Sequence, residues 1–281
     1  MNFQKALAWS VFWIGLSLLT AVGISFYSGG ANAEAFLTGY ALEKVLSIDN
    51  LFVFLMFFTF FGVSRAAQRR VLNYGVIGVV VLRGILIFAG IALVQQFEWL
   101  MYIFGAIVIY TGFVMAFGGT KEFNAEKSAT IGLISRFINV TKTFHGSQFF
   151  IRENGKLIAT PLFLVLAVIE VSDVIFAVDS IPAIFSVTRN PFLVYSSNIL
   201  AVLGLRSLYF LLERAHDAFR FVKQGVGIIL WFIGFKMIVP AFWPKVVITN
   251  EAALTVVLVV LLSSIILSVS LKPRAKTHGK G

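Results

Sequence analysis

The chain has 281 residues, of which 59% are hydrophobic and 13% are charged, and 30 are phenylalanine. This composition excludes an ordinary soluble domain and indicates a protein that crosses a membrane several times. No cysteine is present, so disulfides, thiolate metal sites and thiol redox catalysis on this chain are excluded.

Eight continuously apolar stretches are long enough to cross the hydrocarbon core as helices, which takes about 20 residues each. They cover residues 6–27, 35–62, 72–94, 99–118, 160–187, 192–213, 225–243 and 252–271. They lack the alternation of barrel strands, so we predict an all-α polytopic membrane protein with about eight transmembrane helices. Residues 1–33 also resemble a secretory signal, but their apolar run exceeds the usual length of about 7–15 residues. A retained first helix is therefore expected, with cleavage as the alternative.

The formal net charge of +10 is explained by loops that alternate in basic content. Basic residues follow the second, fourth and sixth apolar stretches and fill the tail, whereas the intervening loops carry few. This bias is typical of cytoplasmic loops, so both termini are predicted to be cytoplasmic. An integral protein of the bacterial inner (plasma) membrane is expected. The lipid bilayer accounts for the basic charge, and no nucleic-acid partner is expected.

An internal repeat organises the chain. SIDNLFVF (47–54) parallels VSDVIFAV (171–178), VLRGILIF (81–88) parallels GLRSLYFL (204–211), and FGAIVIYTGFVMA (104–116) parallels VGIILWFIGFKMI (226–238). Three helices per unit is an odd number, so the second unit is predicted to be inverted relative to the first, as in many secondary transporters. The predicted segments are a first helix with its outer loop (1–34), unit one with helices 2–4 (35–118), a cytoplasmic loop (119–159), unit two with helices 5–7 (160–245), an eighth helix (246–271) and a basic tail (272–281). Helices 1 and 8 are peripheral in this plan, and the repeated glycines 105, 112, 227 and 234 are expected to permit close helix contact.

Acidic residues inside predicted spans are costly and mark a candidate ion pathway. They are Glu43, Asp49, Glu170, Asp173 and Asp179. Together with Asn50 and Asn198 they offer hard oxygen ligands, which suit Mn²⁺, Mg²⁺ or Ca²⁺. The competing interpretation is a set of buried ion pairs that hold the helices together, although burying so many charges for stability alone is unfavourable.

Four basic residues also fall within predicted spans, namely Lys44, Arg83, Arg206 and Lys236. Arg83 and Arg206 occupy matched repeat positions and are candidate counter-ions of the acidic cluster. Snorkelling to the headgroups is the alternative for both arginines and for Lys44. Any role of Lys236 is confined to unit two.

Convergence of the acidic residues on one site requires interrupted helices. On straight helices Glu170 and Asp173 share a face, whereas Asp179 lies about 180° from Glu170. Pro182 and Gly39 offer the means of interruption, so the second and fifth helices are expected to be broken or kinked.

These motifs resemble the TerC family of integral membrane proteins, including its Alx-like members. The resemblance covers about residues 35–245 and depends on ALEKVLSIDNLFVF, VIEVSDVIFAVDSIPAIF and SNILAVLGLRSLYF. It implies membership of the LysE-type transporter superfamily and an association with manganese efflux and tellurite resistance. It also implies that Glu43, Asp49, Asn50, Glu170, Asp173 and Asp179 belong to the metal pathway.

The motifs and the resemblance together predict an exporter of a divalent metal cation, with Mn²⁺ favoured by the resemblance, that works by alternating access around an intramembrane carboxylate site with proton coupling. The cation is the substrate, and no covalent cofactor is expected. The alternatives are an exporter of a small organic solute of LysE type and a membrane scaffold in a stress response without transport. No nucleophile–base pair or cofactor fingerprint stands out, so an enzyme is not expected.

Overall fold

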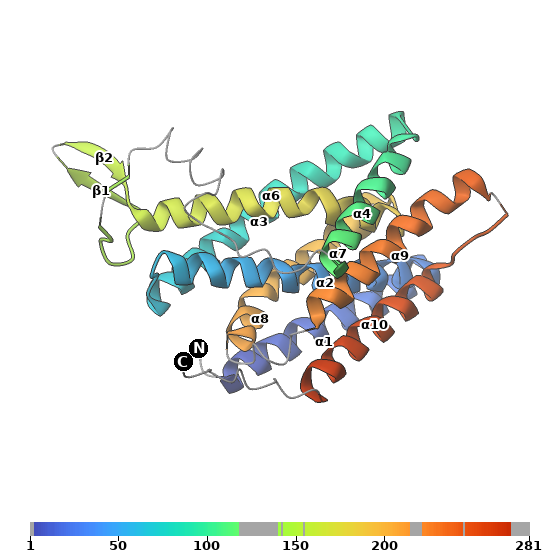
Figure 1. Cartoon of the computed structure of the whole chain (residues 1–281), viewed down its shortest axis with the longest axis horizontal. Helices are drawn as coiled ribbons and strands as arrows, with labels where there is room; N and C mark the ends of the chain where they lie inside the picture. Colours follow the sequence, from blue (N-terminus) through green and yellow to red (C-terminus); the bar gives the residue numbers. More distant parts are fainter. Residues whose placement is uncertain are drawn as a thin grey trace, which may run out of the picture.

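The computed structural model describes residues 3–117, 140–141, 143–153, 155–213, 221–243 and 245–270, and the side chain of Asp49 lies outside the described part. Helices account for most of this chain (Figure 1). They are α1 (Phe3–Ser28), α2 (Gly30–Phe60), α3 (Arg65–Gln96), α4 (Leu100–Phe117), α6 (Pro161–Phe185), α7 (Pro191–Leu203), α8 (Leu205–Leu212), α9 (Val222–Phe242) and α10 (Asn250–Ser270). A hairpin of β1 (Phe150–Glu153) and β2 (Lys156–Ala159) precedes α6. Of the predicted cytoplasmic loop, residues 119–139, 142 and 154 are outside the described part, as is the tail 272–281.

Long apolar helices confirm an all-α polytopic membrane protein. Six of the described helices are long and apolar enough to cross a membrane, and α7 with α8 would form a seventh span bent by 40°. The remaining long helix, α2, has 31 residues and four charged side chains, and it does not meet the same apolar standard. The total of eight spans therefore stays a prediction.

The predicted break in the second and fifth helices is wrong, because both helices are continuous. Helix α2 runs unbroken from Gly30 to Phe60, and α6 runs unbroken from Pro161 to Phe185. Pro182 lies in the last turn of α6, so its missing N–H affects only the end of that helix. The break falls instead in the sixth predicted span, at Gly204 between α7 and α8.

The helices of the two predicted units run in opposite directions in Figure 1: α6 runs against α2, α7–α8 against α3, and α9 against α4. The packing is reciprocal between the units. The first helix of unit one, α2, packs on the second helix of unit two, α7, and the second helix of unit one, α3, packs on the first helix of unit two, α6. Helices α2 and α6 also contact each other, as do α4 and α9. This arrangement is what an inverted repeat requires, although the symmetry of the units stays a prediction.

Glycines bring α4 and α9 into close contact, as the sequence predicts. A Cβ atom at Gly112 would lie 2.5 Å from the backbone nitrogen of Trp231 and 2.6 Å from the carbonyl oxygen of Gly227. A Cβ atom at Gly234 would lie 2.8 Å from the carbonyl oxygen of Gly105. Any larger residue at these positions would force the two backbones apart, so these glycines are what allows α4 and α9 to pack in close contact.

Candidate functional site

Four helices place polar side chains at one buried position in the bundle. Glu43 comes from α2, Arg83 from α3, Asp173 from α6 and Asn198 from α7, and none of the four residues is more than 1% exposed. We call these four residues the buried polar cluster. Two members belong to each predicted repeat unit, so the cluster lies at the contact between the units.

Arg83 is the centre of the buried polar cluster. Its Nε atom donates to Asp173 Oδ2 at 2.8 Å, and its Nη2 atom donates to Asp173 Oδ1 at 2.8 Å. Such a two-pronged arginine–carboxylate pair is among the stronger hydrogen-bonded ion pairs in proteins. The Nη1 atom of Arg83 donates to Glu43 Oε1 and, at 3.4 Å, to Asn198 Oδ1. One guanidinium therefore bridges carboxylates from two different helices.

Two neutral side chains also donate hydrogen bonds to Glu43. Asn198 Nδ2 donates to Glu43 Oε2 at 3.0 Å, and Ser47 Oγ donates to Glu43 Oε1 at 3.3 Å. Ser47 follows Glu43 by one helical turn, so both side chains lie on one face of α2. The sequence analysis missed Ser47, although its i+4 spacing from a buried acid was a readable signal. With two carboxylates and one guanidinium, the cluster has one formal negative charge in excess.

Glu170 lies one turn before Asp173 on α6 and forms no ion pair with any residue that the structure describes. Both of its carboxylate oxygens are buried, and neither has a hydrogen-bond partner among the described residues. Its carboxyl group fits against α3 because a glycine is opposite: a Cβ atom at Gly78 would lie 2.5 Å from each carboxylate oxygen. A buried carboxylate without a partner costs free energy, so this position suits a group that binds a cation, a proton or a mobile guanidinium.

The other predicted ligands are not gathered with the buried polar cluster. Asp179 Oδ1 accepts a hydrogen bond at 3.0 Å from Thr111 Oγ1 on α4. Because α6 is unbroken, Asp179 falls on a different face of the helix from Asp173. Asn50 is buried at 4% exposure on α2, and the side chain of Asp49 lies outside the described part. Within the part of the chain that the structure describes, no three acidic or histidine side chains are grouped closely enough to hold a metal ion.

Of the basic residues predicted within spans, only Arg83 belongs to the buried polar cluster. Arg83 joins the cluster, whereas Arg206, its predicted counterpart, lies on α8 and lines a cavity with Trp9 and Trp13 of α1. Lys44 does not reach outward, because its Nζ atom donates at 3.0 Å to the carbonyl oxygen of Ala201, just before the break in the sixth span. The sequence analysis missed this contact, which depends on where the helix breaks.

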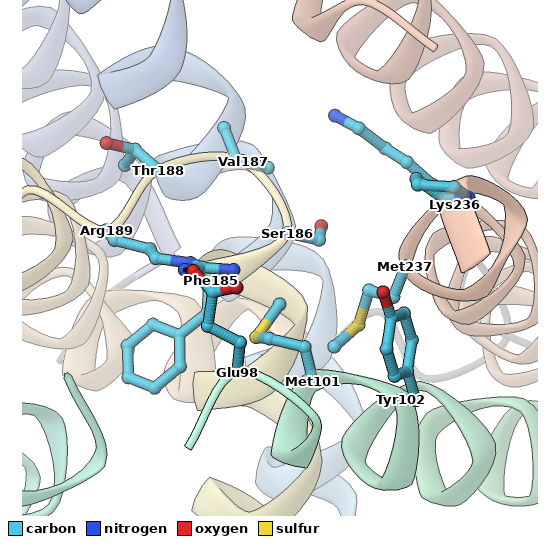
Figure 2. Close-up of a pocket in the computed structure, with 11 residues that line it drawn as sticks. Glu98, Met101, Tyr102, Phe185, Ser186, Val187, Thr188, Arg189, Lys236 and Met237 are labelled. Atoms are coloured by element: carbon cyan, nitrogen blue, oxygen red, sulfur yellow. Dashed lines mark ion pairs between the residues drawn. The ribbon is translucent and has the colours of Figure 1, made fainter. Parts of the chain in front are cut away.

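Lys236 belongs to a second polar region. Its Nζ atom donates to Asn250 Oδ1 at 2.8 Å, and it borders a cavity of about 360 Å³ between the start of α4, the end of α6 and α9. In Figure 2 the Lys236 ammonium lies apart from the Arg189 and Glu98 side chains, which form an ion pair at 3.9 Å. Lys236 is thus separate from the buried polar cluster.

Comparisons with known proteins agree with the sequence motifs. The family described as "Integral membrane protein TerC family" matches residues 28–276. The protein named "Putative membrane-bound redox modulator Alx" is 48% identical in Escherichia coli (strain K12) and in Photorhabdus laumondii, over 251 residues that cover 86% of this chain and 78% of each relative. The "Uncharacterized membrane protein STKORF319" of Myxococcus xanthus is 42% identical over 277 residues, which cover 99% of this chain and 86% of that protein. No solved structure matches.

Proposed function

We propose, from the premise that this chain belongs to the TerC family of integral membrane proteins, that it exports a divalent metal cation, with Mn²⁺ as the favoured substrate. The observation that carries the proposal is the buried polar cluster, in which Arg83 bridges Glu43 and Asp173 between the two units. Structural ion pairing alone explains this cluster poorly, because apolar side chains of the same volume would stabilise the bundle at least as well.

The ligand chemistry favours a hard cation. Glu43, Asp173 and the amide oxygen of Asn198 are oxygen donors, which suit Mn²⁺, Mg²⁺ or Ca²⁺ better than copper or zinc. Two carboxylates balance the charge of one divalent ion. Arg83 serves as the counter-ion in the cation-free state, and the arriving ion displaces its guanidinium.

Glu170 is the proposed partner of the displaced guanidinium. It projects from α6 one turn from Asp173, and it has no hydrogen-bond partner among the described side and main chains. A move of the Arg83 side chain from Asp173 towards Glu170 would free Asp173 for the metal and keep the guanidinium paired. Arg83 is on α3, and both Asp173 and Glu170 are on α6, which packs against α3. Movement of Arg83 between the two carboxylates would therefore couple metal binding to the position of α3 relative to α6.

Alternating access is proposed to arise from movement of the two units against each other. Two observations support this mechanism: corresponding helices of the two units run in opposite directions, and the units pack reciprocally, α2 on α7 and α3 on α6. Transporters built from inverted repeats share this arrangement. Proton exchange on one or more of the carboxylates would couple metal efflux to proton entry, and Asp49 and Asp179 are proposed to lie along the same pathway. The redox role in the relatives' printed name cannot rest on thiol chemistry of this chain, which contains no cysteine.

Transport into inverted membrane vesicles tests the proposal. Uptake of Mn²⁺, Ca²⁺ and Mg²⁺ is measured with and without a pH gradient, for the wild type and for Asp49→Asn and Asp173→Asn. We expect Mn²⁺ uptake that each substitution abolishes while folded protein stays in the membrane. Glu98→Gln, at a side chain that is 83% exposed, is the matched control and should transport normally. Equal Mn²⁺ uptake by the wild type and both aspartate variants would contradict the proposal.

A further inference from the structure

A second cationic position lies outside the buried polar cluster, where α1 meets α8. Arg206 and Ser207 of α8, Leu203 at the end of α7, and Trp9 and Trp13 of α1 line a cavity of about 320 Å³. Figure 1 shows α1 and α8 meeting at the end of the bundle where α1 begins. The transport proposal does not use this cavity.

Arg206 is short of hydrogen-bond acceptors. Its Nε atom is buried, and no acceptor for it is found among the described residues. Glu213, which caps the C-terminal end of α8, is paired with Arg65 at 3.1 Å. A buried guanidinium N–H without an acceptor costs free energy, so a ligand with anionic oxygens would be stabilised here.

The surroundings of Arg206 point to a ligand that comes from the membrane. Trp9 is 50% exposed, so the cavity opens onto the outer surface of α1, which also exposes Phe12 and Leu19. Arg206 precedes Glu213 by seven residues, or about 10 Å of helix, which puts the guanidinium within reach of the headgroups. Tryptophan at this depth is typical of the membrane–water interface.

A second positive charge lies close by. The Lys44 ammonium, bound to the Ala201 carbonyl oxygen, is next to Gly204, and Gly204 also faces Trp13. A Cβ atom at Gly204 would lie 3.3 Å from the Cβ atom of Trp13, so α1 covers the helix break closely. The break therefore lies between the Lys44 ammonium on one side and Trp13 of α1 on the other, and Arg206 follows it by two residues.

We propose that this cavity binds the phosphodiester headgroup of an anionic phospholipid, with Arg206 as the phosphate ligand and the acyl chains lying along α1. A basic pocket between transmembrane helices, near the basic end of the bundle, is a typical place for such lipids. The bound lipid joins α1 to the broken sixth span, so it stabilises the position of the break.

Native mass spectrometry of the full-length protein tests the proposal, with dioleoylphosphatidylglycerol, dioleoylphosphatidylcholine and inorganic phosphate as probes. We expect the wild type to retain phosphatidylglycerol in preference to phosphatidylcholine. Arg206→Gln should lower the affinity for phosphatidylglycerol about fivefold, the contribution of one basic residue near an anionic surface, and Arg206→Lys should retain most of it. Arg189→Gln, at the opposite end of the bundle, should behave as the wild type.

Three outcomes would overturn the lipid site. One is an unchanged preference for phosphatidylglycerol in Arg206→Gln. Another is displacement of the lipid by inorganic phosphate at comparable concentration, which would indicate a small-anion site instead. If Arg206→Gln does not fold, Trp9→Leu decides, because this half-exposed side chain lines the cavity without supporting the core. A preference for phosphatidylglycerol that survives Trp9→Leu undiminished is the third such outcome.

Discussion

Substitution of Arg83 by glutamine separates a transport site from a structural ion pair. The change removes the cation of the buried polar cluster and leaves Glu43 and Asp173 facing each other at 0% and 1% exposure. Removing one partner of a buried ion pair costs about 3–5 kcal/mol, because the remaining charge is buried without compensation. Glu43 keeps its hydrogen bonds to Ser47 and Asn198, so a cost within that range, and not above it, is expected.

A divalent cation should reverse part of this loss if the carboxylates form its site. A ligand that binds only the folded state at 100 times its dissociation constant adds about 2.7 kcal/mol of stability. In the wild type the ion must first displace Arg83, so the gain there should be smaller. We therefore expect Mn²⁺ to stabilise Arg83→Gln more than it stabilises the wild type.

Thermal unfolding of the detergent-purified protein, followed by tryptophan fluorescence, measures both effects. Each variant is unfolded with chelator and across a series of Mn²⁺ concentrations. Arg65→Gln is the matched control, because Arg65 forms a surface pair with Glu213 through a side chain that is 65% exposed. Such pairs contribute about 1 kcal/mol or less. The reasoning is refuted if Arg83→Gln and Arg65→Gln lose the same stability, or if Mn²⁺ raises the unfolding temperature of Arg83→Gln no more than that of the wild type.

Two further substitutions test individual contacts. In Gly78→Ala the new methyl group would meet the Glu170 carboxyl group, whose flexible side chain can turn away, so we expect a folded protein with reduced Mn²⁺ uptake in vesicles. Gly15→Ala is the control and should leave uptake unchanged, because a Cβ atom at Gly15 meets nothing within 4 Å. Normal uptake by Gly78→Ala would contradict the proposed role of Glu170. Lys44→Met leaves the Ala201 carbonyl oxygen without its charged donor and should lower the stability in the same unfolding assay by about 1.5–3 kcal/mol. A loss below about 0.5 kcal/mol would show that solvent or backbone replaces the donor.

Several features were predictable because they follow from the membrane environment. Long apolar runs must form helices in hydrocarbon, where no water satisfies the backbone. Charged residues in such runs must turn towards the protein interior, and Glu43, Arg83 and Asp173 do so. The repeated glycines of α4 and α9 predicted close contact, because only a residue without a side chain lets two backbones approach so closely.

The pairing within the site was not predictable from spacing alone. Arg83 and Arg206 have similar sequence surroundings, yet only Arg83 meets the carboxylates. The difference arises from the break at Gly204, which puts Asn198 of α7 in the cluster and Arg206 of α8 beside α1. Local sequence repeats in the two units could not reveal a bend that depends on packing against other helices.

By itself the sequence determined that this is a helical membrane protein with acids buried in its spans, because each of those properties follows from the cost of polar groups in hydrocarbon. Only the tertiary structure decided which charges meet. Because α6 is unbroken, Asp179 lies on a different face of the helix from Asp173 and accepts a hydrogen bond from Thr111. The packing of α3 on α6 brings Arg83 within hydrogen-bond distance of Asp173. An ion pair depends on distances of a few ångströms between helices that are far apart in the chain, and those distances follow from the packing of the whole bundle.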